Sequence, residues 1–167
     1  TISKQTFMKT TNTLKFAIFF FALFSLNPLT AQYTELAKSL PELFGTRKGD
    51  QVGKSVAVDG NYAVLGAPFG GDSILKSGCA YIYFFNGSSW VEQAKLTASD
   101  GAIYDNFGLK VSISGDYVLI GASYDDDAGN SSGSAYIFSK PAGGWVDTTQ
   151  TAKLTASDAT AGDYFGH

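Results

Sequence analysis

The sequence has few of the side chains on which most enzymes depend. Among its 167 residues there is one histidine, at position 167, and one cysteine, at position 79. No Ser-His-Asp set, zinc-ligand spacing or phosphate-binding glycine loop can be assembled from it. A single cysteine cannot form an internal disulfide, and its place beside the apolar run 80–83 predicts a buried thiol. The sequence therefore predicts no catalytic residue in this segment.

Charge is also scarce. Charged residues make up 16% of the chain, and the formal net charge is −3. Three lysines lie before residue 32, in and ahead of the leader described below, so the rest of the chain carries 12 − 3 = 9 basic and 15 acidic side chains, a net charge of −6. Such a chain does not attract nucleic acid or anionic lipid by bulk electrostatics. Nineteen glycines against four prolines are typical of short strands joined by tight turns.

The N-terminal part has the features of a secretory signal peptide over residues 8–31. Met8 is followed by two lysines and by the 11-residue apolar run Phe16–Leu26, which is too short to span a bilayer. A buried core helix is the alternative, but polar residues do not interrupt the run on one face. The small Ala31 predicts cleavage before Gln32. We therefore expect a secreted or cell-surface protein without a transmembrane segment in its mature part.

After the leader the chain repeats itself. Gly60 and Gly115 occupy equivalent places at an offset of 55 residues, as do Trp90 and Trp145. The stretch Lys-Leu-Thr-Ala-Ser-Asp recurs at an offset of 58, so three residues are inserted after the second tryptophan, which predicts a surface loop. The predicted divisions are upstream or artefactual residues 1–7, a linker at 32–49, repeat 1 at 50–104, repeat 2 at 105–162, and the start of a truncated third repeat at 163–167.

Each repeat is predicted to hold four antiparallel strands. In repeat 1 they span about 54–58, 61–66, 79–85 and 90–97, with equivalents in repeat 2, and turn sequences such as Asp59-Gly60-Asn61 separate them. A four-stranded unit cannot cover its own apolar faces, so copies must stack against one another. The predicted fold class is therefore all-β, a partial β-propeller of about two blades.

A short motif opens each unit, with an aspartate two residues before an apolar-Gly pair. The pairs are Val52-Gly53, Phe107-Gly108 and Phe165-Gly166; the first two are followed in order by Gly66-Ala67-Pro68 and Gly121-Ala122. These landmarks resemble FG-GAP repeats, the repeats of the integrin α-subunit propeller and of many secreted bacterial proteins. The resemblance covers about residues 50–167. It implies an N-terminal fragment of a seven-bladed propeller with an extracellular role in adhesion or ligand binding.

Many members of that family carry an Asp-rich calcium loop between the two landmarks. Here each interval holds one carboxylate, Asp59 or Asp116, and calcium requires six to eight oxygen ligands. The densest acidic cluster lies elsewhere, at Asp125, Asp126 and Asp127, just past the second Gly-Ala pair. Calcium is one hypothesis for this cluster. A solvated polar loop is the favoured one, because adjacent carboxylates do not converge as alternating ones do.

Two further sets of residues admit a functional and a structural interpretation. The pairs Asp100/Asp105 and Asp158/Asp163 keep a spacing of five in both repeats, which allows a metal or acid–base site. Their repetition favours turn capping, because each blade needs its turns capped whereas a catalytic pair is rarely duplicated. The two tryptophans likewise favour blade packing over a sugar-stacking platform.

The sequence thus predicts an exported, non-catalytic propeller module that binds an extracellular protein or carbohydrate through loops on one rim. Two alternatives stay open. One is an accessory propeller of a larger secreted hydrolase or lyase, and the other is a structural array stabilised by calcium.

Overall fold

The computed structural model describes residues 49–71 and 76–167. The predicted signal peptide at 8–31, its cleavage site between Ala31 and Gln32, residues 1–7 and all but the last residue of the predicted linker lie outside the described residues. Within the described part, no helix is long and apolar enough to cross a membrane.

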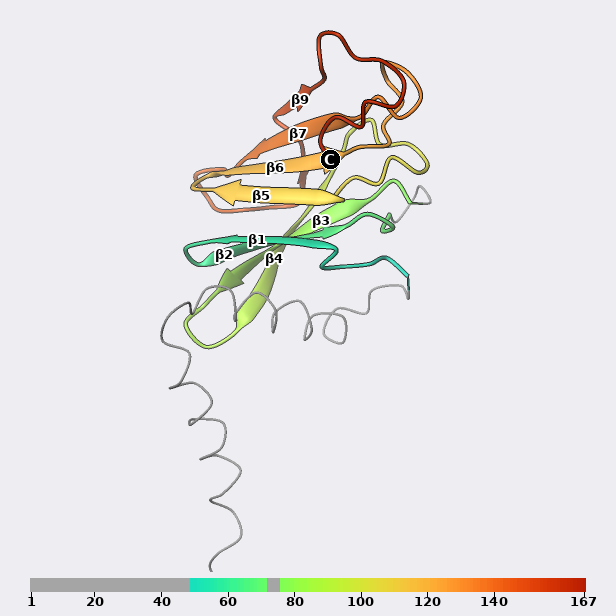
Figure 1. Cartoon of the computed structure of the whole chain (residues 1–167). Helices are drawn as coiled ribbons and strands as arrows, with labels where there is room; N and C mark the ends of the chain where they lie inside the picture. Colours follow the sequence, from blue (N-terminus) through green and yellow to red (C-terminus); the bar gives the residue numbers. More distant parts are fainter. Residues whose placement is uncertain (1–48, 72–75) are drawn as a thin grey trace, which may run out of the picture.

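Nine strands form two sheets, which confirms the all-β prediction (Figure 1). The first sheet has the order β1-β2-β3-β4-β8 and the second has the order β5-β6-β7-β9. The strands are β1 (Ser55–Asp59), β2 (Tyr62–Ala67), β3 (Cys79–Phe85), β4 (Trp90–Thr97), β5 (Lys110–Ser114), β6 (Tyr117–Ala122), β7 (Ser134–Ser139), β8 (Thr148–Thr149) and β9 (Ala152–Leu154). Below, the first unit is β1–β4 and the second unit is β5–β7 with β9.

Tight turns set the register of the opening hairpin in each unit. Asp59 pairs with Tyr62 across β1 and β2, and Ser114 pairs with Tyr117 across β5 and β6, which leaves two-residue loops. The first loop residue is Gly60 or Gly115, each with φ of 55°. Two-residue hairpins favour glycine at such positions because a side chain is strained at positive φ. The glycine at this position therefore gives the opening hairpin the same strand register in both units.

The main core lies between the two units. Val64, Ile82 and Leu96 of the first unit are fully buried in one cluster with Val118 and Ile120 of the second unit. In Figure 1 the two sheets accordingly lie one above the other, with β1 facing β5. The thiol of Cys79 is fully buried, as predicted.

The landmark glycines lie where the units approach one another most closely. A Cβ on Gly66 would overlap the backbone carbonyl of Gly108, and a Cβ on Gly121 would overlap that of Gly166. The amide of Gly108 also donates to the carbonyl oxygen of Gly121 within its own unit, at 3.0 Å. The second and third apolar-Gly pairs therefore contact the Gly-Ala pair of the unit before them, and only glycine permits that separation.

The residue before each apolar-Gly pair has a left-handed backbone in all three copies of the motif. The φ angles are 56° at Gln51, 57° at Asn106 and 53° at Tyr164. Non-glycine residues rarely adopt this conformation, so its recurrence identifies a shared structural device. The following phenylalanine of the second copy, Phe107, forms a parallel bridge to Gly78 of the first unit and is 1% exposed.

The fourth strand of the second unit is shorter than its predicted equivalent. β4 spans eight residues, whereas β9 spans three. The inserted segment departs from the sheet and forms β8, which pairs in parallel with β4 of the first unit. The insertion is therefore a connection between the units and not a free surface loop.

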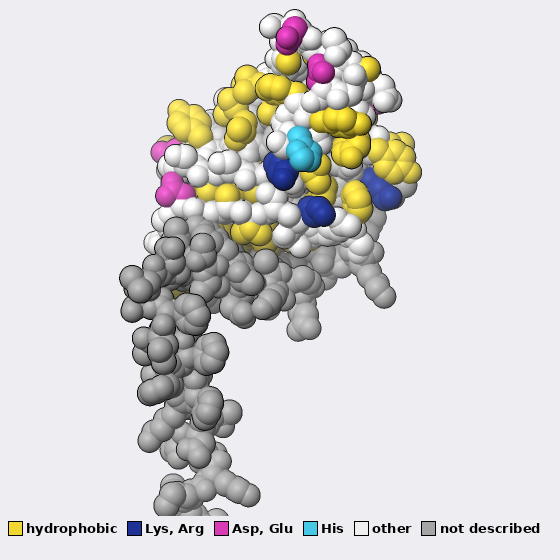
Figure 2. Space-filling view, viewed as in Figure 1, with side chains coloured by type: hydrophobic (Ala, Val, Ile, Leu, Met, Phe, Trp, Pro, Cys, Tyr) yellow, Lys and Arg dark blue, Asp and Glu magenta, His cyan; other side chains and the backbone are white. Residues whose placement is uncertain are grey.

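The outer face of the second unit leaves apolar side chains in contact with solvent. Figure 2 shows hydrophobic side chains at the surface of the part that Figure 1 draws as the β5–β9 sheet. Leu119 is 43% exposed and Leu154 is 41% exposed, although their equivalents Val64 and Leu96 are fully buried.

Candidate functional site

Three carboxylates and one ammonium group converge where the two units meet. Asp100 lies between β4 and β5, Asp125 and Asp127 lie between β6 and β7, and Lys153 lies in β9. One oxygen from each aspartate lies within 4.8 Å of the others. The Nζ of Lys153 donates to Asp100 Oδ2 at 2.7 Å and to Asp125 Oδ2 at 3.0 Å, and it also pairs with Asp127. We call these four residues the lysine–carboxylate cluster.

The side chain of Tyr136 packs against the cluster. The hydroxyl of Tyr136 donates to Asp125 Oδ2 at 2.8 Å, and the ammonium of Lys153 lies 5.1 Å from the centre of the Tyr136 ring. Asp125 is 3% exposed, so it is not part of a solvated loop. Hydrogen bonds to ionised groups are strongest where water is excluded.

The three adjacent aspartates singled out in the sequence therefore have different partners. Asp125 and Asp127 join the cluster, whereas Asp126 accepts a hydrogen bond from the amide of Ser131 at 2.6 Å and holds its own loop. The calcium hypothesis for these three residues stays a prediction. The position between two of them is occupied by Lys153.

The environment holds Asp125 and Lys153 in their charged forms. Burial raises the pKa of Asp125, but bonds from the amide of Asp127, from Lys153 and from Tyr136 outweigh burial and leave that pKa below its usual value. Burial lowers the pKa of Lys153, and its bonds to the carboxylates outweigh burial, so this pKa lies above its usual value. Asp125 and Lys153 are therefore an ion pair at neutral pH.

The lysine–tyrosine pair occurs in both units. Lys95 is the equivalent of Lys153, and its ammonium lies 5.9 Å from the centre of the Tyr81 ring, much as Lys153 lies over Tyr136. At the place of the buried Asp125 the first unit has Gly70. The buried carboxylate at this position is therefore particular to the second unit.

A second feature, the strap, is formed by residues 146–150. Its Asp147 accepts a hydrogen bond from the amide of Lys95 at 2.8 Å, and its Gln150 accepts one from the amide of Ser99 at 3.0 Å. Between them, β8 pairs with Leu96 and Thr97. The strap thus covers the outer edge of β4, an edge that would otherwise present unpaired backbone groups.

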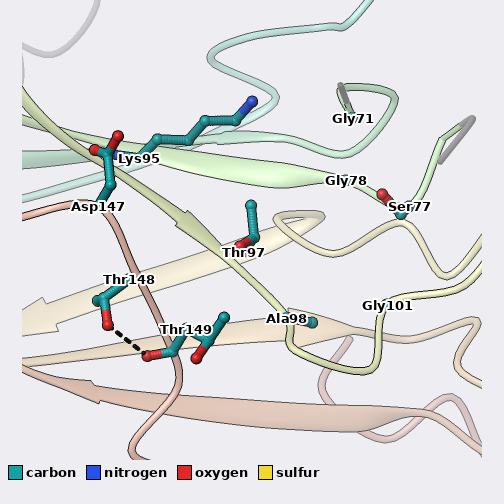
Figure 3. A pocket seen from close by; sticks show the side chains of 10 residues that line it. All are labelled: Gly71, Ser77, Gly78, Lys95, Thr97, Ala98, Gly101, Asp147, Thr148 and Thr149. Atoms are coloured by element: carbon teal, nitrogen blue, oxygen red, sulfur yellow. Dashed lines mark hydrogen bonds between the residues drawn. The ribbon is translucent and has the colours of Figure 1, made fainter. Parts of the chain in front are cut away.

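A hollow of about 410 Å³ lies between the strap and the ends of β3 and β4. Figure 3 shows side chains from both units around it. Its lining is rich in hydroxyl groups and backbone: Gly71, Ser77, Gly78, Lys95, Thr97, Ala98, Gly101, Asp147, Thr148 and Thr149. The volume is that of a small-molecule pocket. Hydroxyl groups both donate and accept hydrogen bonds, so the lining suits a neutral, polar ligand.

The remaining candidate residues are structural. Asp105 accepts a hydrogen bond from the amide of Ala102, and Asp163 accepts one from Thr160, each at 2.6 Å, which confirms turn capping at these two positions. Asp100 does not pair with Asp105, because it is drawn to Lys153 instead.

Both tryptophans pack against other apolar side chains. Trp145 is 2% exposed and belongs to the core between the units, and the ring of Trp90 lies 5.4 Å from that of Phe85. The packing prediction is confirmed, and Trp145 does not offer a ring to a sugar.

Sequence reasoning missed Lys153 and the strap. The change of offset from 55 to 58 was a usable signal, because it placed extra residues directly before Lys153. No local pattern predicted which surface those residues would contact.

Comparisons with known proteins agree with the repeat assignment. The FG-GAP repeat matches the chain over three segments, residues 45–83, 90–138 and 148–167. A comparison with curated proteins finds no match. The matched segments together cover more than half of the chain.

Proposed function

Since the chain belongs to the FG-GAP repeat family, we propose that it is an exported, non-catalytic β-propeller module that binds an extracellular ligand. The hollow of about 410 Å³ at the junction of the two units carries this proposal. Binding modules of repeat proteins use surfaces formed by neighbouring repeats. This hollow meets that condition because β4 and the loops before β3 and after β4 supply one wall and the strap supplies the other.

The chemistry of the hollow favours a carbohydrate over a charged or apolar ligand. Thr97 and Thr149 lie opposite each other as paired residues of β4 and β8, and both line the hollow. Sugars present alternating donors and acceptors, and threonine hydroxyls serve as either. The one ammonium and the one carboxylate of the lining, on Lys95 and Asp147, balance each other in charge. A single neutral sugar residue is therefore the proposed occupant.

The test is a glycan array followed by titration calorimetry with the best binder. We expect Thr97→Val and Thr149→Val each to weaken binding by about tenfold, because each removes one hydroxyl and keeps the side-chain shape. Thr155→Val is the matched control, since Thr155 is the exposed equivalent of Thr97 in the second unit. Equal affinity of all three variants would place the ligand elsewhere, and capture of a protein ligand with no glycan bound would favour adhesion to protein.

Export rests on the leader, and its test is separate. The secreted protein should begin near Gln32 when its N-terminus is sequenced, because Ala31 precedes the predicted cleavage point. Mature protein that still carries the apolar run 16–26 would refute export by cleavage of this leader.

A further inference from the structure

The lysine–carboxylate cluster brings together more negative than positive charge. Three aspartates surround one lysine, and their oxygens lie within 4.8 Å of one another. Without an intervening cation, carboxylates this close repel one another and lose solvation. Lys153 supplies that cation from within the chain and bonds to all three.

The members of the cluster come from both units. Asp100 follows β4 of the first unit, whereas Asp125, Asp127 and Lys153 belong to the second unit. Lys153 therefore ties the loop that leaves the first unit to the loop between β6 and β7. The Lys153 side chain is 18% exposed and that of Asp125 is 4% exposed, so solvent screens this pair less than it screens a surface ion pair. The side chain of Asp100, which joins Lys153 to the first unit, is 37% exposed.

We propose that the ammonium of Lys153 is the resident cation of a three-carboxylate site at the unit junction, which makes this junction independent of divalent metal ions. The lysine does here what a bound metal ion does elsewhere, since it neutralises converging carboxylates and fixes two loops to each other. Because the ammonium group is covalently attached to the chain, it stays at the site at any concentration of metal ions.

The test compares melting temperatures of the full chain in chelator and in millimolar calcium chloride. Wild type and Lys153→Arg should melt at the same temperature in both solutions, because each keeps its own cation. Lys153→Met should melt about 5 °C or more lower in chelator, since three carboxylates are left without a partner. Calcium should restore much of that loss, because oxygen ligands from three carboxylates are then free for it.

Lys140→Met is the matched control, because Lys140 pairs with the exposed carboxylate of Asp116. It should lose less stability, with no response to calcium. Should Lys153→Met fail to fold in chelator, the double variant Lys153→Met/Asp127→Asn keeps the test open. The double variant has one uncompensated negative charge fewer, so its melting temperature should be higher than that of Lys153→Met.

A rise in the wild-type melting temperature with calcium would overturn the proposal. So would a Lys153→Met variant that is as stable as Lys140→Met, or one that calcium does not stabilise.

Discussion

The two units are close copies in sequence and differ in what covers them. Val64 and Leu96 of the first unit are fully buried against the second unit, whereas their equivalents Leu119 and Leu154 are 43% and 41% exposed. The same strand positions thus contribute a core in one copy and an open face in the other. Each unit takes its stability from its neighbour, as in other repeat proteins.

The largest expected effect comes from truncating the buried member of such a pair. Leu96→Ala should lower the free energy of unfolding by about 2–5 kcal/mol, because it leaves a cavity in the core between the units. Leu154→Ala should cost less than about 1 kcal/mol, since its side chain already contacts water. Urea unfolding measures both, and equal losses would contradict the difference in burial.

Substitution of a glycine at the contact between the units should have the second-largest effect on stability. Gly66→Ala is expected to cost about 1–3 kcal/mol, because its Cβ would overlap the carbonyl of Gly108 and force the units apart. Gly121→Ala meets the same overlap with the carbonyl of Gly166 and should cost a similar amount. A loss at only one of the two positions in urea unfolding would contradict this shared contact.

A hydrogen bond between the units should have a smaller effect. The amide of Val111 donates to the hydroxyl of Ser55 at 3.1 Å, across the contact of β1 with β5. Ser55→Ala should cost about 1 kcal/mol, since an amide loses its partner. Lys110 holds the equivalent place in the second unit and is exposed, so Lys110→Ala should be close to neutral in the same unfolding assay.

Acid should produce the smallest effect. The pKa of Asp125 lies below its unfolded-state value of 3.8, so the stability it contributes is complete above pH 3.8 and is lost as the pH falls through the folded-state pKa. Burial raises the pKa of nearby Asp105, which gives a slope of opposite sign. Denaturation of wild type and Asp125→Asn at several pH values isolates the contribution of Asp125, and identical slopes below pH 3.8 would disprove it.

Much of the first unit could be predicted from local patterns. The turn at Asp59-Gly60-Asn61 and the apolar runs on either side placed β1 and β2 within about one residue of their observed bounds. The packing of Trp145 and the turn capping by Asp105 were predicted because both recur or have an equivalent in the other copy. Repetition separates structural requirements from the features that belong to one unit.

The candidate sites were less accessible to prediction. The hollow depends on the strap lying against β4, and the cluster depends on Asp100 meeting a lysine 53 residues further along the chain. Neither contact has a periodic signature, because each joins the two units only once. The prediction of a solvated loop at 125–127 was wrong for Asp125 for the same reason.

The sequence by itself determined the repeat, the order of strands within a unit and the positions at which only glycine is tolerated, because turns and alternating burial are local properties. The tertiary structure alone decided where three carboxylates meet one ammonium, which edge the strap covers, and which of two equivalent faces is buried. These depend on contacts between residues far apart in the chain, and the energy of such a contact is set by the distance and by the solvent that the fold leaves around it.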